Sequence, residues 1–300
     1  MEVRLLHTCT GHRAALYALC EGEDSGCFRS AGGDGWIVEW RLDAPDTGRV
    51  VADTGGRVFS MLALDARRLV CGDMNGGLHW IDLTDPSKGR DIARHHKGVF
   101  DLLLFGDHVW SAGGDGILTR WAADQARAIE SIQLSAQSLR TLALSPSRGN
   151  LAVGGSDKSI YLLDPETFAL NATLKDAHAS SVFALAWTPD GRYLLSGGRD
   201  AMLRVWDADA NFKLVDEQAA HWYTINHLVF SPDGRFFATA SRDKTLKIWD
   251  AATFRLLKVI DTIRYGGHIN SVNRLLWLPG GLISCSDDST LKIWAVAAAS

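Results

Sequence analysis

Short stretches in which apolar and polar residues alternate recur along the whole chain. The clearest is residues 236–250, where one alternating run is followed by a polar turn at 242–245 and then by a second alternating run. Alternation of this kind around a tight turn predicts two antiparallel strands. Asp243 lies in the turn, and Trp249 lies six positions later, near the end of the second run.

This spacing of an Asp and a Trp marks seven copies of one unit. Five copies have both residues: Asp34 with Trp40, Asp115 with Trp121, Asp200 with Trp206, Asp243 with Trp249, and Asp288 with Trp294. Weaker copies, Asn75 with Ile81 and Asp157 with Leu163, fill the two gaps. Successive copies lie about forty residues apart, and a strand–turn–strand unit with this period predicts a β-propeller with about four strands in each blade.

Two of the copies carry further shared residues. Each ends in a Trp-Asp pair and has a His 22 residues before its turn Asp, namely His178 with Trp206-Asp207 and His221 with Trp249-Asp250. With these residues the chain resembles the WD-repeat (WD40-type) β-propeller family along its whole length. The resemblance implies an all-β fold, with one domain over residues 1–300 and seven four-stranded antiparallel blades. It leaves function open, because the family consists mostly of interaction platforms with diverse partners.

The two ends of the sequence predict how the ring closes. Only residues 295–300 follow Trp294, too few for a good outer strand of the last blade. Residues 3–7 precede the first repeat and have strand character. We therefore expect the N-terminal strand to pair with the last blade, which removes an open sheet edge.

A quartet of His, Ser or Thr, Asp and Trp recurs in five repeats. Its members are His12, Ser30, Asp34 and Trp40; His95, Ser111, Asp115 and Trp121; His178, Ser196, Asp200 and Trp206; His221, Thr239, Asp243 and Trp249; and His268, Ser284, Asp288 and Trp294. The alternative is a Ser-His-Asp catalytic triad, which is recognised by geometry and is normally present once. By resemblance, the repeated quartet is a buried hydrogen-bonded network within each blade.

Some repeats depart from the quartet. In the third repeat, His95 and His96 are both candidates, and counting back from Val99 favours His95. The second repeat has Thr54, Cys71, Asn75 and Ile81 at the four positions, and the fourth has Ser135, Val153, Asp157 and Leu163. Because each missing hydrogen bond removes about 1 kcal/mol, we expect these two blades to be the less stable ones.

Composition narrows the classes of function. A net charge of −4 offers no basic face for nucleic acid. No apolar run reaches transmembrane length and no signal peptide is apparent, so we expect a cytoplasmic protein without membrane contact. The five Cys lack CxxC spacing, which argues against a disulfide framework or a zinc site. No cofactor or nucleotide motif is present, and we do not expect an enzyme.

By resemblance, three positions in each repeat face one mouth of the central channel. They include four arginines, four aromatic residues and one acid: Arg57, Arg140, Arg199, Arg242, Tyr17, Phe59, Phe100, Phe183 and Asp287. Arginine and aromatic residues are enriched at binding hot spots, and guanidinium groups match carboxylates and phosphates. The alternative for the phenylalanines is packing between blades.

Trp222 and Tyr223 form a second candidate for partner binding. They follow His221 in the loop that leads into the sixth blade. Two adjacent aromatic residues on a loop do not both bury easily, so one is expected to be an exposed anchor. The alternative is that they pack against a neighbouring blade.

Together these patterns predict a non-catalytic interaction scaffold. Its arginine-rich mouth would bind an acidic or phosphorylated segment of a partner protein, as a subunit of a larger complex. The alternative is a propeller that binds a small molecule or glycan, including one with enzymatic activity. Paired carboxylates at the mouth would favour that alternative, but Asp287 is the single acid there.

Overall fold

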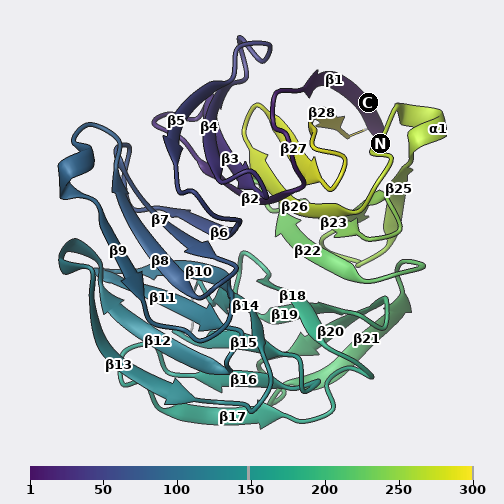
Figure 1. The fold of residues 1–300 in the computed structure, drawn as a ribbon. Helices are drawn as coiled ribbons and strands as arrows, with labels where there is room; N and C mark the ends of the chain where they lie inside the picture. Colours follow the sequence, from purple (N-terminus) through teal and green to yellow (C-terminus); the bar gives the residue numbers. More distant parts are fainter. Residues whose placement is uncertain (147–148, 299–300) are drawn as a thin grey trace.

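The chain forms a ring of seven sheets around a central axis, as Figure 1 shows. The computed structural model describes residues 1–146 and 149–298, so residues 299 and 300 of the C-terminal segment lie outside the described part. Each sheet has four antiparallel strands. The seven-bladed propeller predicted from the repeat is therefore confirmed.

Within each of the first six blades, the strands follow chain order from the axis outward. Blade one has β2 (Leu16–Glu21), β3 (Cys27–Gly32), β4 (Trp36–Arg41) and β5 (Arg49–Asp53). Blade two has β6 (Val58–Ala63), β7 (Arg68–Asp73), β8 (Gly77–Asp82) and β9 (Arg90–Ala93). Blade three has β10 (Val99–Phe105), β11 (His108–Gly113), β12 (Ile117–Ala122) and β13 (Arg127–Gln133).

The second half of the ring repeats this order. Blade four has β14 (Leu139–Leu144), β15 (Leu151–Gly155), β16 (Ile160–Leu163) and β17 (Leu170–Leu174). Blade five has β18 (Val182–Trp187), β19 (Tyr193–Gly198), β20 (Met202–Asp207) and β21 (Lys213–Ala219). Blade six has β22 (Ile225–Phe230), β23 (Phe236–Ser241), β24 (Leu246–Asp250) and β25 (Leu256–Ile260). Short helical turns occur at Pro86–Lys88, Ala123–Gln125 and α1 (Thr262–Tyr265).

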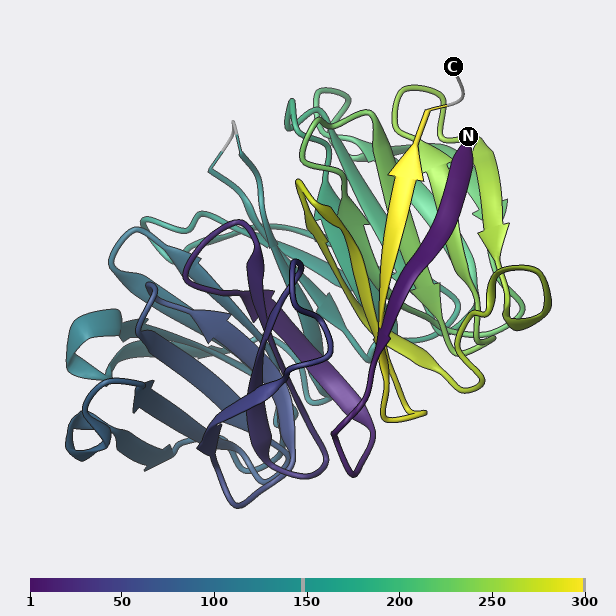
Figure 2. The same cartoon turned by 90° about the horizontal axis from the view of Figure 1, so that it is seen from above.

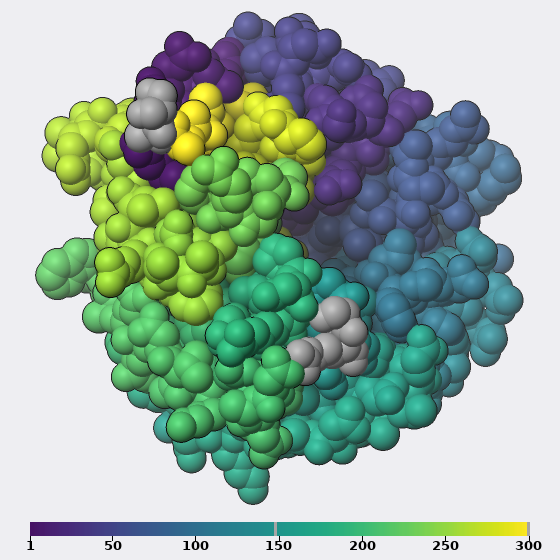
Figure 3. Space-filling model, turned by 180° about the vertical axis from the view of Figure 1, so that it is seen from behind, coloured from purple at the N-terminus to yellow at the C-terminus, as the bar shows by residue number. Residues whose placement is uncertain are grey.

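Blade seven joins the two ends of the chain. It contains β26 (Val272–Leu278), β27 (Gly281–Ser286), β28 (Leu291–Ala297) and, as its outer strand, β1 (Glu2–Cys9). The N-terminal and C-terminal strands run side by side in Figure 2, and their colours meet again in the space-filling view of Figure 3. The predicted closure is thus confirmed, with a longer N-terminal strand than residues 3–7.

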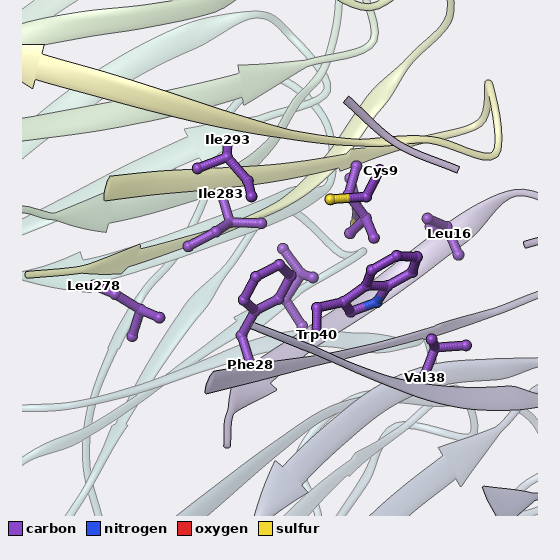
Figure 4. Packing of buried hydrophobic residues seen from close by; sticks show 11 residues of the cluster. Cys9, Leu16, Phe28, Val38, Trp40, Leu278, Ile283 and Ile293 are labelled. Carbon is purple, nitrogen blue, oxygen red and sulfur yellow. The ribbon is translucent and has the colours of Figure 1, made fainter. Parts of the chain in front are cut away.

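The core lies between neighbouring blades. Seven apolar clusters each combine side chains from two adjacent sheets. At the junction of blades seven and one, Phe28 and Trp40 pack near Ile283 and Ile293, with Cys9 of β1 beside them (Figure 4). Burial at such junctions requires both partners, so each blade depends on its two neighbours.

The closing strand can be tested with a matched pair of substitutions. Val3 is 7% exposed and Leu6 is 46% exposed, although both lie on β1. Val3→Ser should lower the free energy of unfolding by about 2 kcal/mol because it removes a buried apolar side chain, whereas Leu6→Ser should change it little. Deletion of residues 1–8 should destabilise the chain further. Thermal unfolding followed by circular dichroism measures both effects; an unchanged midpoint in the truncated chain would contradict the prediction.

Candidate functional site

The five quartets form continuous hydrogen-bonded chains. In blade six, His221 Nδ1 lies 2.9 Å from Asp243 Oδ2, and His221 Nε2 lies 2.8 Å from Thr239 Oγ1. Trp249 Nε1 donates to the same Thr239 oxygen at 3.0 Å. The equivalent bonds occur in blades one, three, five and seven, where the third blade uses His95 and leaves His96 exposed.

The electrostatics of the quartets favour a neutral His next to an ionised Asp. Burial lowers the pKa of His221 and His268 below the usual 6.5, although their carboxylate partners act in the opposite direction. Burial would raise the pKa of Asp243 and Asp288, but hydrogen bonds and charge from the histidines outweigh it and lower both. The His therefore donates from Nδ1 to the carboxylate, and its Nε2 accepts from the hydroxyl. With every group occupied inside the blade, the quartet is a scaffold element.

Blades two and four use other side chains for the same purpose. In blade two, His79 bridges Asp73 (3.1 Å) and Asp91 (2.6 Å). In blade four, Asp157 accepts hydrogen bonds from Ser135 (2.7 Å) and from the Tyr161 hydroxyl. Burial, followed by the Asp157 hydrogen bond, raises the pKa of Tyr161 to about 12. The lower stability expected for these blades remains a prediction.

The quartet Asp also fixes the loop in front of each inner strand. Its carboxylate accepts the backbone N–H of the residue that follows the His, at 2.9–3.1 Å, in all five blades: Arg13, His96, Ala179, Trp222 and Ile269. These loops lie at the end of the ring where the inner strands begin. We call this end the mouth. The buried network thus holds the surface of the mouth in place.

Every inner strand has an irregular residue at the mouth. The pairing of the first two strands shifts at the second residue of each inner strand, which places one unpaired residue there. Such bulges redirect a side chain. The seven bulge residues are Tyr17, Phe59, Phe100, Arg140, Phe183, Asn226 and Asn273.

The other two expected mouth positions lie beside the bulge. In all seven blades, the residue before the turn Asp, or before Asn75 in blade two, donates its N–H to the carbonyl of the residue before the inner strand, at 2.7–3.0 Å. These bonds join Arg57 to Met74, Ser181 to Arg199, and Thr224 to Arg242. The structure therefore brings the three positions together in each blade.

One half of the mouth is aromatic and cationic. Tyr17 meets Phe59 edge-on at 5.2 Å between ring centroids, and Phe59 stacks on Phe100 at 5.5 Å. The Arg140 guanidinium lies 4.0 Å from the centroid of Phe100 and 5.2 Å from that of Phe183. These half-buried rings contact one another across blade boundaries. The expected packing of Phe59 and Phe100 between blades is therefore found, and the role of these rings in partner binding stays a prediction.

The other half of the mouth is polar. Asn226 donates to Ser271 (3.0 Å) and to the carbonyl of Val272 (2.8 Å). Asn273 donates to the carbonyl of Leu16 and to Asp287, both at 2.8 Å. These bonds link blades six, seven and one, and they give Asp287, the one acid among the expected mouth positions, a hydrogen-bond partner.

The mouth arginines have no acidic partner among the described residues. None of Arg57, Arg140, Arg199 and Arg242 forms an ion pair there. Arg140 donates a hydrogen bond to Ser156 Oγ (2.9 Å), and Arg57 donates one to Met74 Sδ (4.0 Å). Burial, and then the charge of Arg199, lower the pKa of Arg140. A half-buried cation without a counter-ion favours an anionic ligand.

An ion pair crosses the channel directly beneath the mouth, and sequence reasoning missed it. Asp101 Oδ1 lies 2.9 Å from Arg274 Nη2, although the two residues belong to blades three and seven, which are not neighbours. Asp101 also accepts the Leu142 N–H at 2.8 Å. Both residues directly follow a bulge residue, so the pair forms a floor under the mouth.

Trp222 and Tyr223 are both exposed at the mouth, by 87% and 61%. Both side chains are therefore largely exposed, as expected for at least one of them, and their role as a binding anchor stays a prediction. Among the described residues, no group of three His, Cys, Asp or Glu side chains is arranged to hold a metal ion. Within residues 1–146 and 149–298, no helix has the length and apolar character needed to cross a membrane.

The quartets make stability depend on pH. Burial lowers the pKa of His12, His95, His221 and His268 below 6.5 in the folded chain. Below that value the unfolded chain binds more protons, so stability falls on acidification, by up to about 1.4 kcal/mol per histidine and pH unit. The thermal unfolding midpoint should therefore drop between about pH 7 and about pH 5, and His221→Gln should reduce the slope. A midpoint that stays constant or rises would contradict this assignment.

Comparison with known proteins agrees with the geometry. Three segments match the family model described as "WD domain, G-beta repeat": residues 169–207, 212–250 and 258–295. Each begins with the outer strand of one blade and continues through three strands of the next. No curated protein sequence matches the chain.

A solved structure described as the WD40 beta propeller domain of Doa1 is similar in fold. Its TM-score is 0.85 at 20% sequence identity, over 99% of this chain and 97% of that chain. At this identity the likeness concerns the fold alone. With seven four-stranded blades the chain is a β-propeller, and three of its repeats match the WD40 repeat model.

Proposed function

We propose that the chain is a non-catalytic protein-interaction scaffold whose mouth binds an acidic or phosphorylated segment of a partner protein. The observation that carries this proposal is the set of four mouth arginines without an acidic partner among the described residues. Planar guanidinium groups bind carboxylates and phosphates with two parallel hydrogen bonds. An anionic segment would supply the ion-pair partners that these arginines lack among the described residues.

The geometry supports a ligand that lies on the mouth. The Asp101–Arg274 pair (2.9 Å) bridges the channel one residue below the bulge ring. A peptide would therefore rest on the ring of aromatic side chains and reach the arginines from above. Arg57, Arg199 and Arg242 are exposed around this ring, and half-buried Arg140 lies within it.

A scaffold role also fits the groups that resemble catalytic residues. The His, Ser or Thr, and Asp of each quartet bond one another inside a blade and leave none of their ring nitrogens for a substrate. Asp287, the acid of the mouth, is bound to Asn273 at 2.8 Å. Five free, buried cysteines suit a reducing compartment, so we place the protein in the cytoplasm, as a subunit of a larger complex.

Removal of the four arginines tests the proposal. Arg57, Arg140, Arg199 and Arg242, changed together to Ala, should lower the affinity for a fluorescein-labelled decaglutamate peptide at least tenfold, or about 1.4 kcal/mol. The difference in affinity between wild type and the variant should shrink as salt is added, because salt screens the charges and weakens the wild-type complex. Fluorescence anisotropy measures the affinity, and affinity capture from native lysate with mass spectrometry identifies the natural partners.

A control variant with the same change of net charge separates the effect of the mouth arginines on binding from the effect of net charge. Arg67, Arg127, Arg235 and Arg255 are exposed at the ends of the strands away from the mouth. Their joint change to Ala should leave peptide binding and captured partners as in wild type. Equal binding by wild type and the mouth variant would overturn the proposal.

A further inference from the structure

Four large apolar side chains are exposed on the loops that lead into blades six and seven. Trp222 is 87% exposed, Tyr223 61%, Ile263 96% and Ile269 61%. We call these four residues the apolar ledge. Trp222 and Ile269 occupy the same position in consecutive blades, directly after His221 and His268. In the other quartet blades this position holds Arg13, His96 and Ala179, so the apolar character is confined to one side of the mouth.

The ledge is held rigidly. The N–H of Trp222 donates to Asp243 Oδ2 at 3.0 Å, and that of Ile269 donates to Asp288 Oδ2 at 3.1 Å. The Thr262 hydroxyl donates to the carbonyl of His268 at 2.6 Å, which ties α1, with Ile263, to the loop that carries Ile269. Exposed side chains on a fixed backbone lose little conformational freedom on binding, which suits an anchor site.

The blade-six part of the ledge, Trp222 and Tyr223, adjoins exposed cations of the mouth. The Ser241 hydroxyl donates to the carbonyl of Tyr223 at 3.2 Å, and the N–H of Arg242 donates to the carbonyl of Thr224 at 3.0 Å. Arg242 and Lys244 are exposed on the same turn, and among the described residues neither forms an ion pair. Apolar anchors and unpaired cations thus share one surface.

We infer that the apolar ledge binds a large apolar side chain of the partner segment, with acidic residues next to it in sequence. The apolar side chain would lie on Trp222 and Ile269, and the acidic neighbours would face Arg242 and Lys244. The positive charge of this surface favours an acidic segment, because a neutral or basic apolar segment would leave Arg242 and Lys244 without a counter-ion. The inference rests on the proposed function and adds the motif that the partner must carry.

Peptide selection tests this motif without a known partner. A phage library of random dodecapeptides is selected on wild type and depleted on the Trp222→Ala/Ile269→Ser variant. Enriched peptides should contain an aromatic residue or Leu flanked by at least two acids. A fluorescein-labelled copy of the most enriched peptide should bind the ledge variant at least tenfold more weakly. Val50→Ser/Leu170→Ser, at side chains that are 49% and 45% exposed on outer strands, is the matched control and should bind as wild type does.

The outcomes separate this inference from the proposed function. Weaker peptide binding by both the ledge variant and the four-arginine variant supports both. Wild-type affinity in the ledge variant, with loss in the arginine variant, overturns the inference and leaves the proposed function standing. Enrichment of peptides without acids, or no enrichment over the ledge variant, overturns the inference. Ledge-dependent binding to phosphatidylserine vesicles, or ledge-dependent self-association in sedimentation, would also overturn it, because the occupant would then be a membrane or a second copy.

Discussion

An unpaired residue at the mouth of each inner strand shapes both the ring and its surface. A bulge redirects one side chain, and it also leaves backbone groups of the inner strand without their ladder partners. In two places the residue after the bulge also bonds the inner strand of the next blade: Ser60 donates to the carbonyl of Val99, and Asp101 accepts the N–H of Leu142. The side chains of the mouth and these blade-to-blade bonds therefore lie on neighbouring residues of the inner strands.

The quartets connect the buried hydrogen bonds of each blade to the loops at the mouth. Each quartet Asp bonds its His inside the blade and the next loop N–H at the surface, as Asp243 does with His221 and Trp222. The scaffold can stay constant while the residue after the His changes from blade to blade. This arrangement gives a ring of similar blades a mouth with an aromatic side, a polar side and an apolar ledge.

Local and periodic features could be predicted from the sequence. Side-chain contacts between residues far apart in the chain could not. The repeat at fixed spacing predicted the seven blades, and the two chain ends predicted the closing strand. The family resemblance implied the bonds of quartets such as His178, Ser196 and Asp200. The Asp101–Arg274 pair joins residues 173 positions apart in blades that are not adjacent, so no repeat could signal it. His79 bridges two acids from a position where the other repeats have no His, and the exposure of Ile269 depends on the course of its loop.

The central claim is that partners meet the protein at the mouth, and site-specific photo-crosslinking tests it most directly. A diazirine amino acid is placed at Met74, which is 41% exposed beside Arg57, or at exposed Arg235 at the other end of the strands. Both proteins are irradiated in native lysate, and the cross-linked peptides are mapped by mass spectrometry. The account predicts cross-links from position 74 alone, to acidic or phosphorylated segments. Cross-links mainly from position 235, or from position 74 to neutral or basic segments, would contradict it.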